Sequence, residues 1–114
     1  MKEYMLIIKG DEPGYKNWPK AKLEELGQKY AAFVGTLKSK HGFSDGSELN
    51  TAGFELTPNN GQIAVDGPFA ETKEVVSGYF VFNAPNIDAA VNIAKLCPAL
   101  TVQNLPCQIF ELSR

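Results

Sequence analysis

The sequence contains too few of the residues on which several common kinds of site depend. It has two cysteines, Cys97 and Cys107, and one histidine, His41, in 114 residues. Two cysteines are too few for a disulfide framework, and no second Cys/His pair completes a zinc site. No glycine-rich loop suited to holding a phosphate is found either. We therefore predict neither a metal site nor a cofactor.

An excess of positive charge and a long apolar run are also missing. Lys and Arg number 11 and Asp and Glu 13, a net charge of −2, whereas nucleic-acid-binding proteins normally carry a basic surface. No apolar run approaches the ~20 residues of a membrane span, and the N-terminal residues lack a signal-peptide pattern. The 44% hydrophobic content is typical of a globular domain that needs no metal or disulfide to fold. We expect one cytoplasmic domain over residues 1–114 that binds neither nucleic acid nor membrane.

The periodicity of apolar residues predicts the order of helices and strands. Apolar residues at helical spacing indicate an amphipathic helix from Pro19 to about Lys40, with Gly42 as its terminator. Asn86 is a good N-cap for a second helix, which Pro98 closes. An Asn-Gly turn within residues 58–61 indicates a hairpin. The strands are expected at residues 4–8, 46–56 (irregular, with a Gly inside), 62–66, 78–82 and 107–112.

This β-α-β-β-α-β order, with an extra strand in the middle hairpin, predicts a ferredoxin-like α+β domain. Such a domain has one antiparallel sheet with two helices on one face. The first strand is apolar on both sides, since Tyr4, Leu6 and Ile8 alternate with Met5 and Ile7. Two helices can cover only one face of the sheet. We therefore expect a second copy of the chain to cover the other face, giving a homodimer shaped like an α+β barrel.

The segment 65–74, which reads VDGPFAETKE, resembles the signature of the YCII-related family, also called DGPF-domain proteins. The resemblance extends to residues 4–6, 77–80 and 95–98 and so spans essentially the whole chain. It implies a dimeric ferredoxin-like α+β barrel, but no particular reaction, because most of the family has none assigned.

The sequence departs from the family pattern in three places. Ser77-Gly78 stands where relatives usually have Gly-Gly. The last strand, at residues 108–111, reads QIFE where Glu-Val-Arg-Pro is common, so an arginine that could bind an anion is missing. A histidine carried by a helix in related sequences has no counterpart, since His41 follows the first predicted helix. These departures argue against a catalytic mechanism shared with such relatives.

Asp66 is the strongest candidate for chemistry. A carboxylate at the end of a strand, beside Gly67 and the rigid Pro68, can be held at the mouth of a cleft and accept a proton. An Asp before Gly-Pro can equally accept hydrogen bonds from backbone N–H groups two residues further on and stabilise the turn. The sequence alone leaves both interpretations open.

The residues after Pro68 also have two interpretations each. Phe69 forms either a wall of a ligand pocket or a contact with the dimer partner, packing being the commoner role of a buried aromatic residue. Glu71 and Lys73 belong to a mixed-charge run that is usually a solvated turn. In the functional interpretation, Lys73 attracts an anionic substrate and Glu71 pairs with Asp66, which would raise the pKa of one of the two carboxyl groups.

Three further residues have predicted structural roles. His41 follows the predicted first helix, where a cation favours the negative end of the helix dipole. Trp18 is expected to pack against the start of that helix. Cys97, at the C-terminal end of the second predicted helix, is expected to have a raised thiol pKa.

Two classes of function are compatible with these residues. The first is a homodimeric small-molecule-binding module with a cleft near the loop at residues 66–69. Its contacts to a small anionic ligand would be Gly67, Pro68, Phe69, Glu71 and Lys73. The second is a small acid/base enzyme, a lyase or isomerase, acting on a compact anionic carbonyl compound with Asp66 as the base. We favour the first, because the further catalytic groups that an enzyme usually assembles are not evident.

Overall fold

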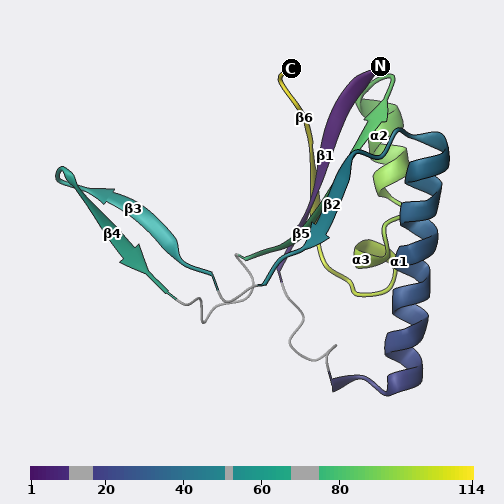
Figure 1. The fold of residues 1–114 in the computed structure, drawn as a ribbon, viewed down its shortest axis with the longest axis horizontal. Helices are drawn as coiled ribbons and strands as arrows, with labels where there is room; N and C mark the ends of the chain where they lie inside the picture. The colour runs from purple at the N-terminus through teal and green to yellow at the C-terminus, as the bar shows by residue number, and fades with distance from the viewer. Residues whose placement is uncertain (11–16, 51–52, 68–74) are drawn as a thin grey trace.

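The computed structural model describes residues 1–10, 17–50, 53–67 and 75–114. Its elements, in chain order, are β1 (Lys2–Lys9), α1 (Lys20–Lys40), β2 (Asp45–Glu48), β3 (Glu55–Asn59), β4 (Gln62–Asp66), β5 (Val76–Ala84), α2 (Ile87–Ala94), α3 (Pro98–Thr101) and β6 (Cys107–Glu111). Four strands form an antiparallel main sheet in the order β2-β5-β1-β6, and the helices lie on one of its faces (Figure 1). This confirms the predicted α+β fold, which is compatible with a ferredoxin-like domain.

The irregular strand predicted at residues 46–56 is two strands that belong to different sheets. β2 pairs with β5 at the edge of the main sheet, whereas β3 pairs with β4 in a separate two-stranded hairpin. The predicted turn of that hairpin is confirmed, since Asn60 and Gly61 have φ values of +51° and +81°. The single-strand prediction was wrong because an apolar pattern interrupted by Gly53 does not show which sheet each half joins.

The core lies between the main sheet and the helices. Tyr4, Leu6 and Ile8 of β1 are buried on the helix-facing side. Their neighbours on β5 are Phe82, opposite Tyr4, and Phe80, opposite Leu6. Paired residues of an antiparallel sheet share a face. The alternation along β1 and β5 therefore sends one set of side chains into the core and leaves the other set on the open face.

The two ends of α1 are held by different means. At the start, the Lys22 ammonium lies 4.0 Å from the centroid of the Trp18 ring, so Trp18 contacts the first turn of the helix. At the end, His41 is the C-cap residue, and its backbone N–H donates to the Leu37 carbonyl oxygen at 2.9 Å. The chain then leaves the helix through Gly42, which has a φ of +55°.

The expectation for Cys97 was wrong. α2 ends at Ala94, and Pro98 begins the short helix α3, so Cys97 precedes a helix instead of closing one. A hydrogen bond between the thiols of Cys97 and Cys107 lowers the pKa of Cys97, and backbone N–H groups of α3 lower it further. The same thiol–thiol hydrogen bond raises the pKa of Cys107.

Replacing Tyr4 with phenylalanine is expected to leave the stability unchanged or raise it by about 1 kcal/mol. The Tyr4 side chain is fully buried, and its hydroxyl has no hydrogen-bond partner within the described part of the chain. A buried hydroxyl without a partner costs about 1–3 kcal/mol, which the substitution removes while keeping the ring. Urea unfolding of the two proteins measures the difference. A loss of more than 1 kcal/mol in Tyr4→Phe would show that the hydroxyl is hydrogen-bonded in solution.

Candidate functional site

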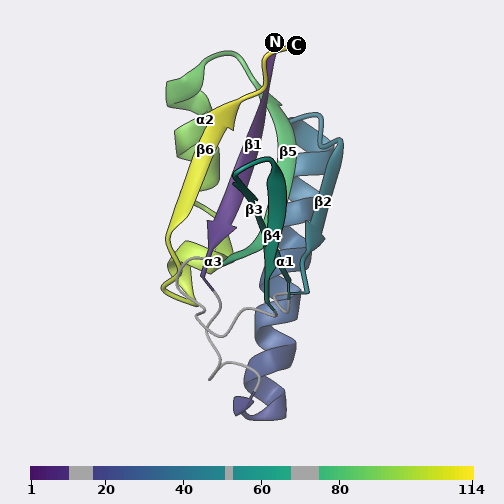
Figure 2. The same cartoon turned by 90° about the vertical axis from the view of Figure 1, so that its left-hand side faces the viewer.

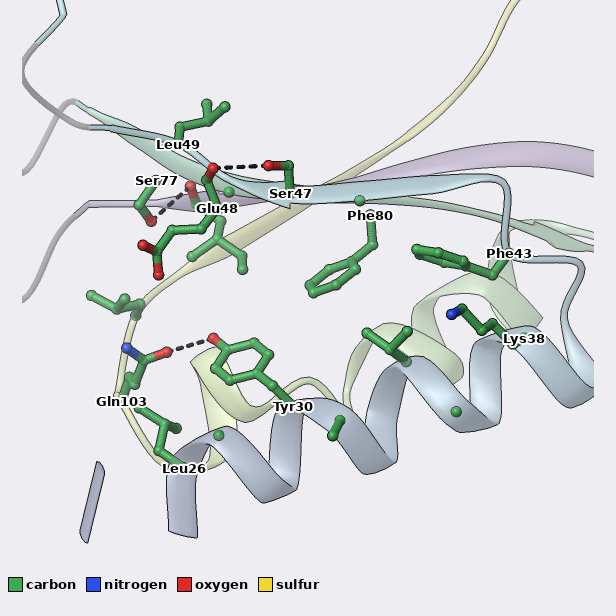
Figure 3. Close-up of a pocket in the computed structure, with 18 of the residues that line it drawn as sticks. Leu26, Tyr30, Lys38, Phe43, Ser47, Glu48, Leu49, Ser77, Phe80 and Gln103 are labelled. Carbon is green, nitrogen blue, oxygen red and sulfur yellow. Dashed lines mark hydrogen bonds between the residues drawn. The ribbon is translucent and has the colours of Figure 1, made fainter. Parts of the chain in front are cut away.

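A cavity of about 840 Å³ lies between α1 and the sheet edge formed by β2 and β5 (Figure 3). Sites for small organic molecules typically occupy ~300–1,000 Å³, so the cavity is large enough for one. The side chains that line it come from the helix, the sheet and the connection before β6, and they include Leu26, Tyr30, Val34, Ile8, Phe80 and Gln103.

Aromatic rings form the apolar middle of the cavity. The Tyr30 and Phe80 rings are stacked, with centroids 6.3 Å apart and an interplanar angle of 22°. The Phe43 ring is tilted against Phe80 with centroids 6.5 Å apart, and Phe33 packs edge-on behind it at 5.3 Å. Phe80 is therefore part of both the core and the cavity. Such ring pairs fix the position of the apolar surface that a ligand would meet.

Glycines line the cavity on both sides. On the sheet, a Cβ atom at Gly46 would lie 2.7 Å from Cδ1 of Phe80, and one at Gly78 would lie 3.2 Å from the Ser47 carbonyl oxygen. On α1, Gly27 and Gly35 also line the cavity, and a Cβ atom at either position would meet no atom within 4 Å. Each helix glycine weakens α1 by roughly 0.5–1 kcal/mol relative to alanine. No described contact requires glycine at these two positions, so their effect is to widen the cavity.

Hydrogen-bonding groups gather at one end of the cavity. The Tyr30 hydroxyl donates to Oε1 of Gln103 at 2.5 Å, and Gln103 is a buried polar side chain, 7% exposed. The Ser77 hydroxyl donates to the Ile8 carbonyl oxygen at 3.5 Å. Figure 3 shows the Glu48 carboxylate between Ser77 and this Tyr30–Gln103 pair. This end therefore offers a carboxylate and several oxygen acceptors to a ligand.

The opposite end carries a positive charge. Lys38, in the last turn of α1, lines the cavity beside Phe43, and its ammonium lies 5.9 Å from the Phe43 ring centroid. Figure 3 shows Lys38 and Phe43 at the end away from Glu48. The cavity thus has an apolar middle, an ammonium at one end, and a carboxylate with hydrogen-bonding groups at the other.

Of the predicted site residues, the structure describes Asp66 and Gly67; Pro68, Phe69, Glu71 and Lys73 lie outside the described residues. Asp66 is the exposed last residue of β4 and lies opposite Glu55 in the hairpin. Neither Asp66 nor Gly67 is among the residues that line the cavity. The predicted pairing of Asp66 with Glu71 therefore stays a prediction.

Gly67 has a clear structural role at the base of the hairpin. Its φ of +150° is unfavourable for residues with a side chain. A Cβ atom there would lie 2.6 Å from Cδ1 of Phe54 and 2.8 Å from the Gly53 carbonyl oxygen. The glycine of the Asp-Gly pair therefore lets the two ends of the hairpin approach each other.

The hairpin and the cavity are connected along the chain. Leu49, just after β2, and Ser77, in β5, both line the cavity, and the chain between them contains the hairpin and the segment 65–74. The candidate site predicted from the sequence lies in this segment and does not include the cavity, because apolar residues at helical or strand spacing look the same whether they fill a core or line a cavity. The spacing of Gly27, Ala31 and Gly35, four residues apart along α1, was a signal that could have indicated it.

The described part of the chain was also searched for a metal site and for a membrane-spanning helix. There, no group of three or more His, Cys, Asp or Glu side chains is arranged to hold a metal ion. Among the same residues, no helix has the length and apolar character needed to cross a membrane.

The fold and the cavity define a small α+β domain with a four-stranded antiparallel sheet, a separate two-stranded hairpin and a ligand-sized space under the edge of the main sheet. The family model of the YCII-related domain matches residues 3–104, and the chain belongs to this family. The matched range includes the segment 65–74 and all residues that line the cavity, except Leu105. A comparison with curated proteins gives no match.

Proposed function

We propose that this protein is a homodimeric small-molecule-binding module whose ligand is a small organic acid held in the cavity between α1 and the sheet. The observation that supports this most strongly is the cavity itself, because its size suits a small ligand and its polar groups lie at the two ends of an apolar middle.

The cavity indicates the chemical class of the ligand. A ring or short chain fits against the stacked Tyr30 and Phe80 rings. A carboxylate on the ligand is attracted by Lys38, and a hydroxyl group at its other end can donate to Glu48. The ligand we infer therefore has an acid group, an apolar body and a hydroxyl group, in that order.

The homodimer is inferred from the open face of the main sheet. Met5 of β1 lies between Val81 of β5 and Phe110 of β6, and Ile7 follows on the same side. The Phe110 side chain is half exposed and those of Met5 and Ile7 are partly exposed, whereas Val81 is 5% exposed. Monomeric proteins rarely leave a large apolar patch open to water, and a two-fold axis covers two such faces with each other.

Asp66 as a general base remains the prediction on which the enzyme alternative rests. That alternative, a lyase or isomerase acting on an anionic carbonyl compound, needs its base beside the bound substrate. Asp66 does not line the cavity, so the binding module is the function that the described residues support better.

A matched series of three compounds tests the proposed ligand class. Isothermal titration calorimetry would compare 3-(4-hydroxyphenyl)propionate, 3-phenylpropionate and 3-phenylpropionamide. We expect the hydroxy acid to bind most tightly and the amide most weakly, with about two- to fivefold between successive members, since partly exposed charge contacts contribute up to about 1 kcal/mol. Absence of binding, or equal affinity for all three, would contradict the proposal.

Two substitutions test whether Lys38 causes the preference for the acid and Glu48 the preference for the hydroxyl group. Lys38→Gln should abolish the preference for the acid over the amide and leave the effect of the hydroxyl group intact. Glu48→Gln should do the reverse. If both variants keep the wild-type order of affinities, the compounds bind elsewhere.

A further inference from the structure

The β3–β4 hairpin has one face made of apolar side chains. Leu56 is paired with Val65 and Pro58 with Ile63, so these four residues share a face, and Phe54 precedes Leu56 by two positions on the same side. We call these five residues the apolar face of the hairpin. Phe54, Leu56, Ile63 and Val65 are 56–67% exposed.

The other face of the hairpin is polar and carries two carboxylates at its base. It consists of Glu55, Thr57, Asn59, Gln62, Ala64 and Asp66. Alternation of this kind is typical of a strand pair with one buried face and one face in water. An isolated two-stranded hairpin is at best marginally stable in water. The hairpin therefore needs a partner surface that the described part of its own chain does not provide.

The hairpin extends from the main sheet on the side opposite to the helices (Figure 1). Seen from that side, β3 and β4 lie in front of β1 and β5 (Figure 2). The hairpin and the open face of the sheet, with Met5 and Ile7, thus lie on the same side of the molecule. A single partner placed there can contact both.

We propose that this partner is a second copy of the chain and that each hairpin is an arm whose apolar face packs against the other subunit. The inference rests on the proposed homodimer and adds to it the element that holds the two subunits together. A two-fold axis at the open face makes the contact reciprocal, so two arms and two sheet faces are buried at once.

The length of the arm supports this choice of partner. Five residues of extended strand span about 17 Å, whereas packed sheets are about 10 Å apart. The hairpin is therefore long enough to cross the gap between two facing sheets and pack its apolar face against the second subunit. The polar face, with Glu55 and Asp66 at its base, then remains in water.

Sedimentation equilibrium of the full chain, over a wide range of protein concentration, tests the arm. The test variant is Leu56→Thr with Val65→Thr, because threonine keeps the β propensity of these positions and adds a hydroxyl group. The control is Ala64→Thr, which places the same residue on the polar face. We expect a wild-type dimer, a dissociation constant raised at least tenfold in the double variant, and a change of less than twofold in the control.

The possible results distinguish a failure of the arm from a failure of the homodimer. A wild-type protein that is monomeric throughout would overturn both the homodimer and the arm. An unchanged dissociation constant in the double variant would overturn the arm and leave a dimer held by the sheet faces alone. Equal weakening in the double variant and the control would also overturn it, because the polar face would then matter as much.

A second measurement, made on the wild-type protein, tests the arm even if the double variant fails to form the hairpin. Hydrogen exchange of the wild-type protein should show protected β3 and β4 amides at concentrations where the dimer forms, and loss of that protection on dilution. Protection that is independent of concentration would overturn the arm. Titration of the double variant with 3-(4-hydroxyphenyl)propionate reports separately on the cavity.

Discussion

Replacing Phe80 with alanine is expected to lower the free energy of unfolding by about 3–5 kcal/mol, the usual cost of deleting a buried aromatic ring. The Phe80 side chain is 8% exposed and contacts the rings of Tyr30, Phe33 and Phe43. The substitution removes the centre of this cluster and joins the resulting void to the cavity. Such a loss is a large fraction of the stability of a typical domain.

Denaturant unfolding at a fixed protein concentration measures the effect of Phe80→Ala. The matched control is Leu96→Ala, which deletes a large side chain that is 62% exposed and should cost less than about 1 kcal/mol. If Phe80→Ala lost no more than the control, Phe80 would not be the packing centre between the helix and the sheet.

Replacing both Gly27 and Gly35 with leucine is expected to weaken ligand binding at least tenfold and to make the fold more stable. Both residues line the cavity, and a Cβ atom at either position has free space around it. The leucine side chains occupy part of the space that a ligand needs. They also remove two helix glycines, which should add roughly 0.5–1 kcal/mol at each position.

The alanine pair Gly27→Ala with Gly35→Ala is the control for this experiment. It should give a similar gain in stability, because alanine also relieves the conformational cost of glycine, but it leaves most of the cavity open. Calorimetric titration with 3-(4-hydroxyphenyl)propionate and thermal unfolding measure the two effects. A leucine pair that bound the acid as well as the wild type would exclude this cavity as the site.

The sequence allowed much of the fold to be predicted, because its patterns are local. The helix at 20–40 follows from apolar residues at helical spacing, and the start of α2 follows from Asn86, whose side chain accepts a hydrogen bond from the Ala89 N–H at 2.9 Å. The Asn60–Gly61 turn fixed the hairpin in the same way. The match to residues 3–104 confirms the family that the segment 65–74 indicated.

The site was harder to predict, because it depends on distances between segments far apart in the chain. Tyr30 and Gln103 are 73 positions apart and meet only when α1 packs beside the α3–β6 connection. The periodicity of Tyr30 and Phe80 is the same whether they fill a core or line a cavity. The separation of β3 from the main sheet was likewise not visible, since strand pairing is set by tertiary contacts more than by local preference.

Methyl-detected NMR shows whether the space between α1 and the sheet binds a small organic acid. On addition of 3-(4-hydroxyphenyl)propionate, we expect shifts of the methyl signals of Leu26, Val34 and Leu105, whose side chains line the cavity. The Val91 and Leu112 methyl signals, which do not line it, should stay unchanged. Shifts confined to methyl groups outside the cavity, or no shifts at all, would show that the cavity does not bind the acid.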